Sequence, residues 1–302
     1  MTHHFDRITK QIIQAIEAGT DAYEMPWHKL GRDTSQPLNA VTGKAYRGLN
    51  ILGLGIAATA AGYPTGRWAS YAQWHSVGAQ VRKGEKGTAI FFWQSRESRT
   101  AEAEDASERR FRGYVARTYS VFNESQVDGC SKIDHPAAIA NPLQCGALTL
   151  LEQLDARVVH GGDRAYFEPA TDLIRMPNPE QFKDRESYLS VRAHETTHWT
   201  GVKARLNRDL TGRFGTSAYA MEELVAELGA AFFCAALGIS QRPCANHAAY
   251  ISSWLKVMRG DNKAILTAAS KAQQAVDYIF EQASTKPGTS VSNDVEDLYL
   301  AA

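Results

Sequence analysis

The stretch VRAHETTHWTG, residues 191–201, places two histidines four positions apart and a glutamate directly after the first of them. Positions i and i+4 lie on one face of an α-helix, so His194 and His198 can both direct a ring nitrogen at one metal ion. Glu195 points about a quarter-turn away, where it can reach a metal-bound water without being a ligand. Gly201 is expected to end the helix. The pattern predicts the metal-binding core of a zinc-dependent hydrolase of the metallopeptidase type.

A catalytic zinc ion usually takes three protein ligands and leaves its fourth position to water, so another segment must supply the third ligand. Residues 221–229, MEELVAELG, carry Glu223 and Glu227 on one face of a predicted apolar helix. Two buried carboxylates without partners would be costly, and a cation between the two helices removes that cost. Glu222 lies off this face and is expected to be solvated. We expect one divalent metal ion per chain, with Zn²⁺ preferred.

The spacing E-x-x-A-E in this second helix resembles the thermolysin-like pattern. The resemblance implies that the first carboxylate, Glu223, binds the metal. It also implies that Glu227 hydrogen-bonds the second ring nitrogen of His194. A surface helix with two histidines is the alternative interpretation, because H-E-x-x-H also arises by chance. The strands predicted before the motif and the acidic helix after it favour a metal site.

The chemistry expected of such a site is metal-assisted hydrolysis. The metal lowers the pKa of a bound water, Glu195 takes its proton, and the hydroxide attacks a carbonyl carbon. A second electrophile often assists, and Tyr219 and Tyr166 are candidates, with packing as the alternative role for each. The motif leaves open whether the site turns over a substrate.

Length and composition suit a two-domain globular protein. The 302 residues are 44% hydrophobic and 22% charged, and 33 basic residues balance 33 acidic ones, so the total charge favours no particular partner. None of the four cysteines forms a C-x-x-C pair, which argues against a cysteine metal site and a disulfide framework. Neither a signal peptide nor an apolar stretch long enough to span a bilayer is visible. We therefore expect a cytoplasmic protein with reduced thiols and no membrane partner.

The predicted fold class is α+β, with a first domain at residues 1–130. Its expected helices are 5–17, which Gly19 caps, 50–61 and 71–77, and its expected strands are 88–93 and 114–122. The segments 23–46 and 95–112 are expected to be loops, the second of them lying between two strands of one sheet.

The second predicted domain, residues 143–302, is mostly helical with a small β-sheet, and a linker at 131–142 precedes it. Its expected strands are 157–159, 165–168 and 173–176, and its expected helices are 147–156, 186–200, 218–237, 247–258 and 264–282. Residues 284–302 are expected to form a loose tail.

The first domain is dense in aromatic and basic residues. Aromatic rings stack on unpaired bases while Arg and Lys follow the phosphates, so this composition indicates single-stranded DNA binding. The candidate DNA-binding residues are Trp27, Arg47, Asn50, Arg67, Trp68, Tyr71, Trp74, Arg82, Lys83 and Lys86. The competing interpretation is packing, because a spacing of three residues between Trp68, Tyr71 and Trp74 also suits a short helix against a core.

Taken together, these motifs resemble the ArdC-type antirestriction proteins of conjugative plasmids and related mobile elements. In the first domain the resemblance rests on PLNAVTGKAYRGLN at residues 37–50, RW at 67–68 and VRKGEKG at 81–87. In the second it rests on residues 194–201 and 219–227. The resemblance covers nearly all of residues 5–282.

The resemblance implies an N-terminal domain that binds single-stranded DNA and a C-terminal zincin-like metallopeptidase domain. It further implies that the protein shields incoming DNA from host restriction enzymes. Two function classes remain open at this point. The chain is either a DNA-binding shield or a DNA-associated zinc metalloprotease that cleaves a restriction enzyme or another DNA-bound or crosslinked protein.

Overall fold

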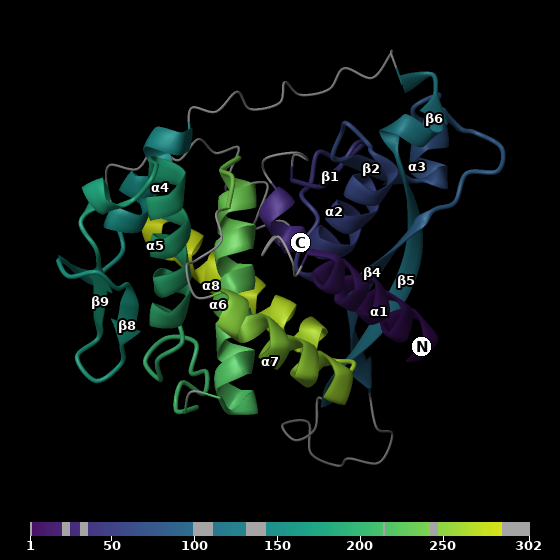
Figure 1. Cartoon of the computed structure of the whole chain (residues 1–302). Helices are drawn as coiled ribbons and strands as arrows, with labels where there is room; N and C mark the ends of the chain where they lie inside the picture. Colours follow the sequence, from purple (N-terminus) through teal and green to yellow (C-terminus); the bar gives the residue numbers. More distant parts are fainter. Residues whose placement is uncertain are drawn as a thin grey trace, which may run out of the picture.

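The computed structural model of the chain describes residues 2–19, 25–30, 36–98, 111–130, 143–213, 215–241 and 247–285. The predicted linker, 131–142, and all but the first two residues of the predicted tail lie outside these ranges. The α+β fold class is confirmed, with helices accompanied by several small sheets (Figure 1). Among the described residues, none of the helices has the length and apolarity needed to cross a membrane.

The N-terminal half is built on a four-stranded sheet in the order β1-β2-β5-β4. Its strands are β1 (Leu38–Asn39), β2 (Arg67–Ser70), β4 (Thr88–Ser98) and β5 (Phe111–Asn123). The helices are α1 (Thr2–Gly19), the 3₁₀ turn η1 (Pro26–Lys29), α2 (Leu49–Ala61) and α3 (Tyr71–Ser76). A second pair of strands, β3 (Gln80–Val81) and β6 (Val127–Asp128), follows, with the 3₁₀ turn η2 (Glu124–Gln126) before β6.

Two expectations for this half are corrected. The segment 23–46 contains η1 and β1, so it is not wholly a loop. The strands β4 and β5 continue into the predicted 95–112 loop, with register from Thr88↔Val121 to Ser98↔Phe111. Backbone groups carry the antiparallel ladder, so polar side chains at 95–98 do not end it. Residues 99–110 of that loop lie outside the described residues.

In the C-terminal half, a three-stranded sheet of order β7-β9-β8 lies beside a group of helices (Figure 1). The strands are β7 (Arg157–His160), β8 (Tyr166–Glu168) and β9 (Leu173–Met176). The helices are α4 (Leu143–Glu152), η4 (Pro179–Gln181), α5 (Arg185–Trp199), α6 (Ser217–Ala236), α7 (His247–Gly260) and α8 (Ala264–Ser284). Caps fix where the two central helices begin: the side chain of Asp184 accepts from Ser187 N and that of Thr216 from Tyr219 N.

One apolar core runs across the two halves. Ile8, Ile12 and Ile16 recur every four residues on α1 and join the same buried cluster as residues of α6 and α8. The α1 helix contacts α7, η1 contacts α6, and α2 contacts α8. An ion pair between Arg47 and Asp277 also joins α8 to the segment before α2. Independent folding of residues 1–130 and 143–302 stays a prediction, and a fragment cut between them would expose parts of this core.

Helices α5 and α6 approach each other closely, and Gly229 of α6 permits the approach. A Cβ atom at Gly229 would lie 2.5 Å from Oγ1 of Thr197 on α5. Thr197 is fully buried, and its hydroxyl donates to the carbonyl oxygen of Ala193 at 2.9 Å. The glycine therefore sets the distance between the two helices that carry the predicted metal ligands.

We expect Gly229→Ala to destabilise the fold by about 1–3 kcal/mol, because an added methyl group overpacks a closed helix interface. Chemical denaturation of the metal-free protein measures the effect. Gly260→Ala is the matched control: it lies at the end of α7, a Cβ there has nothing within 4 Å, and its effect should stay within about 0.5 kcal/mol. Wild-type stability for Gly229→Ala would show that the interface has room to spare.

Candidate metal centre

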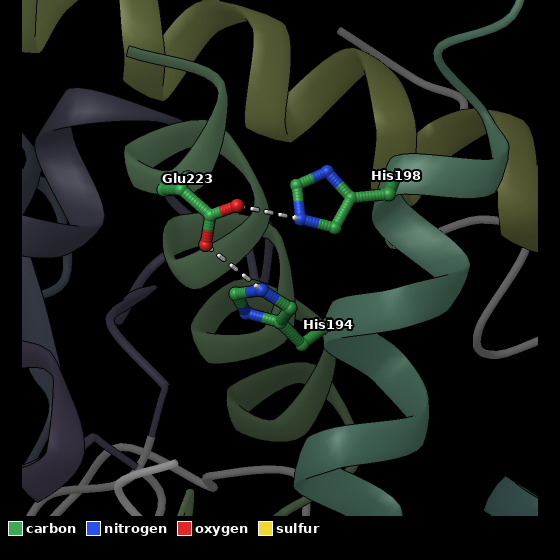
Figure 2. Close-up of side chains that lie close together, drawn as sticks. All are labelled: His194, His198 and Glu223. Atoms are coloured by element: carbon green, nitrogen blue, oxygen red, sulfur yellow. Dashed lines mark ion pairs between the residues drawn. The ribbon is translucent and has the colours of Figure 1, made fainter. Parts of the chain in front are cut away.

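His194 and His198 on α5 and Glu223 on α6 gather their ligand atoms at one point. One ligand atom from each lies within 4.8 Å of the others. The Nε2 atoms of His194 and His198 lie 3.7 and 3.6 Å from the two carboxylate oxygens of Glu223. Figure 2 shows the carboxylate facing both rings. Bonds of about 2.0–2.1 Å in a tetrahedron separate ligand atoms by about 3.4 Å, so the three residues fit a divalent metal ion.

The surroundings of Glu223 keep its carboxyl group ionised, as a metal ligand must be. Burial raises the pKa of its carboxyl group, but the hydrogen bond with His194 and the charges of both histidines lower that pKa to about 2. A carboxylate must be ionised to bind a metal ion, and Glu223 is ionised at neutral pH.

Glu222 was expected to be solvated, and the structure corrects this. Its side chain is buried, and its Oε1 lies 3.2 Å from Nδ1 of His198. Arg208 donates to both oxygens of the same carboxylate, at 2.8 and 3.0 Å. Burial raises the pKa of Glu222, and the bonds from His198 and Arg208 lower it to a net value below the ordinary one. Because Nδ1 of His198 faces a carboxylate, its Nε2 is left to face the metal position.

Glu227 has a matching place beside the other histidine. It is fully buried, and its Oε2 lies 3.6 Å from Nδ1 of His194. Its Oε1 accepts hydrogen bonds from Trp27 Nε1 and Gln241 Nε2, both at 2.9 Å, and lies 3.0 Å from His28 Nε2. The carboxylate therefore lies beside the predicted ring nitrogen, and three side chains hold its other oxygen.

Glu195 lines a cavity of about 900 Å³, which the three metal-ligand candidates also line. It is buried, and burial raises the pKa of its carboxyl group despite the charges of the two histidines and a hydrogen bond from the backbone of Phe167 on β8. Tyr219 and Tyr166, the candidate electrophiles, both line this cavity. The hydroxyl oxygen of Tyr219 lies 3.2 Å from that of Tyr250, and burial raises the pKa of Tyr219.

The predicted DNA-binding rings are mostly in the core, which corrects the sequence-based assignment. Trp27, Trp68 and Trp74 are fully buried and offer no face to a base. Trp74 donates its indole N–H to the carbonyl oxygen of Phe122 at 3.0 Å. Tyr71, between the two later tryptophans, is 50% exposed. The three-residue spacing in this stretch therefore reflects packing for the tryptophans and leaves the tyrosine ring at the surface.

Four of the predicted polar residues make internal contacts. Arg47 pairs with Asp277, Arg67 lies 3.9 Å from Glu124, and Arg82 bonds Glu85 at 2.9 Å. The Asn50 amide bonds both backbone groups of Phe91 at 2.8 Å, on the outer edge of β4. Lys83 and Lys86 are exposed, as predicted for phosphate contacts.

The strands β4 and β5 carry an exposed aromatic surface that the sequence did not predict. Phe92 and Tyr119 are 58% and 47% exposed. Phe92 is opposite Arg117 and Tyr119 is opposite Ile90, so these side chains share one face of the ribbon. In the sequence, Phe92 and Tyr119 are visible only as aromatic residues within predicted strands. Which face of each strand points outward could not be assigned without the strand register.

Each half of the chain matches a known protein family. Residues 3–122 match the family described as the N-terminal domain of anti-restriction factor ArdC. Residues 146–271 match the zincin-like metallopeptidase family.

Curated relatives cover nearly the whole chain. The uncharacterized protein y4eC of Sinorhizobium fredii is 45% identical over 94% of this chain and 93% of its own length. Two proteins called DNA primase TraC, from Escherichia coli, are each 34% identical over 94% and 91% of the chain. The chain spans only 28% and 20% of their lengths.

Two solved structures of the antirestriction protein ArdC from plasmid R388 share this fold. The metal-free structure superimposes with a TM-score of 0.76 at 34% identity, covering 93% of this chain and 97% of that one. The Mn(II)-bound structure gives 0.74 at 33% identity, covering 93% and 98%. The metal-bound relative and the donor set found here both indicate a divalent metal site. The order of the two matched segments and the likeness over the full length show that the chain belongs to the ArdC family of antirestriction proteins.

Proposed function

We propose that the protein binds single-stranded DNA in the cytoplasm and protects incoming DNA from host restriction. We further propose that it holds Zn²⁺ between His194, His198 and Glu223. The likeness to ArdC over nearly the whole of both chains carries the first proposal. Two histidines and one carboxylate are the ligand set of catalytic zinc sites, whereas Mn²⁺ is better suited to oxygen ligands, which supports the second.

The residues around the centre suit hydrolysis of an amide. A bound metal ion supplies Lewis acidity toward a water molecule and a carbonyl group. Glu195 accepts the proton of the attacking water, and burial keeps its basicity above that of an exposed carboxylate. Tyr219 lines the same cavity and can donate its hydroxyl proton to the developing oxyanion.

A protease acting on a DNA-associated protein is the second candidate function. The observation that favours it is the position of β8, which is an edge strand of its sheet. Its residues Tyr166 and Phe167 line the cavity that contains Glu195. An extended peptide can pair with such an edge and bring its carbonyl group to the metal centre.

Two exposed surfaces of the N-terminal half support DNA binding. The first is a groove of about 500 Å³ that includes Tyr71 and Lys83. The second is the hairpin face with Phe92, Tyr119 and Arg117. Planar rings next to cations suit stacking on bases and contact with phosphates, without readout of base edges.

We expect binding to prefer single strands to duplex, to vary little with sequence, and to weaken steeply with salt. Phe92→Ala combined with Tyr119→Ala should cost about 1–3 kcal/mol for each stacked base that is lost. Lys83→Ala combined with Lys86→Ala should reduce the salt slope by about 0.7 per phosphate contact on every sequence. Fluorescence anisotropy with labelled oligonucleotides at several salt concentrations measures both effects.

Val159→Ala is the control for this experiment, because Val159 is 44% exposed and lies in the other half of the chain on β7. It should bind like the wild type. Tighter binding to duplex than to single strands, or a hundredfold preference for one sequence, would overturn the proposal of single-stranded DNA binding.

A further inference from the structure

The carboxylate of Glu227 connects the beginning of the chain to the metal centre. Trp27 and His28 belong to the 3₁₀ turn η1 in the segment that matches the ArdC N-terminal domain. Both side chains are buried. Trp27 Nε1 lies 2.9 Å from Glu227 Oε1, and His28 Nε2 lies 3.0 Å from the same oxygen. The metal-ligand candidates lie in the segment that matches the zincin-like family. The turn η1 therefore contacts Glu227, which lies beside the proposed metal ligand His194.

The hydrogen-bond geometry fixes the direction of these contacts. The backbone N–H of Met25 donates to His28 Nδ1 at 2.9 Å, so the ring proton of neutral His28 is on Nε2. Nε2 of His28 then donates to Glu227. The indole N–H of Trp27 is only a donor, and Gln241 donates from Nε2. All three donors meet Oε1 of Glu227, which leaves Oε2 on the side of His194, 3.6 Å from its Nδ1.

We propose that Trp27 and His28 are positioning residues of the metal centre. They hold the Glu227 carboxylate in one orientation, and Glu227 in turn orients His194 with its proton on Nδ1 and its lone pair on Nε2. The inference rests on the proposed ligand set. It assigns to the ArdC N-terminal segment a part in building the metal site, in addition to any contact with DNA.

Packing makes the turn rigid enough for this role. The Trp27 ring lies 6.0 Å from the Trp254 ring on α7, measured between centroids, and it is fully buried. Pro26 begins the turn with a fixed backbone angle. A donor held on such a turn loses little entropy when it bonds Glu227, which is what orientation of a ligand histidine requires.

The test measures Zn²⁺ affinity of the full-length chain by competition with a chromophoric chelator. Trp27→Phe combined with His28→Phe removes two donors and keeps aromatic bulk, and it should weaken Zn²⁺ binding about 10–100-fold. Trp74→Phe is the matched control, because it also removes an indole donor from the core, at the bond to Phe122. It should bind Zn²⁺ as the wild type does. A folded double variant with wild-type Zn²⁺ affinity would overturn the proposal.

A second measurement uses the wild-type protein and does not depend on how the double variant folds. The chain has 6 tryptophans, whose indole N–H signals can be followed by nuclear magnetic resonance and assigned through Phe substitutions at the other positions. Saturation with Zn²⁺ should shift the Trp27 signal and leave those of Trp68 and Trp74 in place. An unmoved Trp27 signal in a Zn²⁺-loaded protein rejects the inference. A wild type that binds no Zn²⁺ rejects the proposed ligand set itself instead.

Discussion

Glu223→Ala is expected to abolish tight Zn²⁺ binding. The loss should exceed the about 10–100-fold that follows removal of an outer hydrogen-bond partner, because the substitution removes one of three ligands. The Glu223 carboxylate has a pKa of about 2 and faces Nε2 of both histidines, so it contributes the negative charge at the metal position. Metal analysis after dialysis against Zn²⁺, with chelator competition for the residual affinity, measures the result.

Two further variants give this experiment its controls. Glu180→Ala removes an exposed carboxylate on η4 and should retain one Zn²⁺ per chain. Glu227→Ala should weaken binding by less than Glu223→Ala, because Glu227 acts through His194. If Glu223→Ala stays fully loaded while Glu227→Ala loses its metal, the two roles are reversed.

The helix pattern of the metal centre could be predicted because its constraints are local. A spacing of four residues brings His194 and His198 together on any α-helix, and the same rule brings Glu223 and Glu227 together. The elements around them also carried strong signals, since α5 to α8 are long and periodic. The structure brings His194, His198 and Glu223 together as these periods predict, and their role as metal ligands stays a prediction.

The outer contacts of the site depend on how distant segments pack, and periodicity does not contain that information. Glu222 is one residue off the ligand face of the helix, a position that predicted a solvated side chain. In the structure Arg208, from the loop after α5, forms an ion pair with its carboxylate at 2.8 Å. Trp27 is 200 residues from Glu227 in sequence. The sequence around Trp27 is compatible with an exposed or a buried ring. The segment that packs against it must be known before the two can be distinguished.

The DNA-binding prediction failed for the tryptophans for a related reason. Aromatic residues are the largest contributors to burial in a small sheet domain, so a cluster of them indicates a core before it indicates a ligand. Trp27, Trp68 and Trp74 are buried, whereas Tyr71, Phe92 and Tyr119 are exposed among the described residues of the first half. Composition locates aromatic density in the first half of the chain, but only the packing of the folded helices and strands separates the inward rings from the outward ones.

Glu195→Gln is expected to keep Zn²⁺ and the fold while lowering any peptide hydrolysis by about 10²–10⁴-fold. Glutamine has nearly the size and shape of the glutamate side chain, so packing at this buried position is kept. It lacks the basic oxygen that takes a proton from water. We expect protection of incoming DNA from restriction to survive this change, because the proposed function depends on DNA binding rather than on cleavage.

The measurements are Zn²⁺ content, thermal unfolding, cleavage of a labelled protein substrate, and transfer efficiency of unmodified DNA into a restricting host. The Phe92→Ala, Tyr119→Ala double variant serves as the opposite case, with the metal retained and protection reduced. If Glu195→Gln binds Zn²⁺ and single-stranded DNA like the wild type but no longer protects, the chain acts as a DNA-associated protease and the shielding function is wrong.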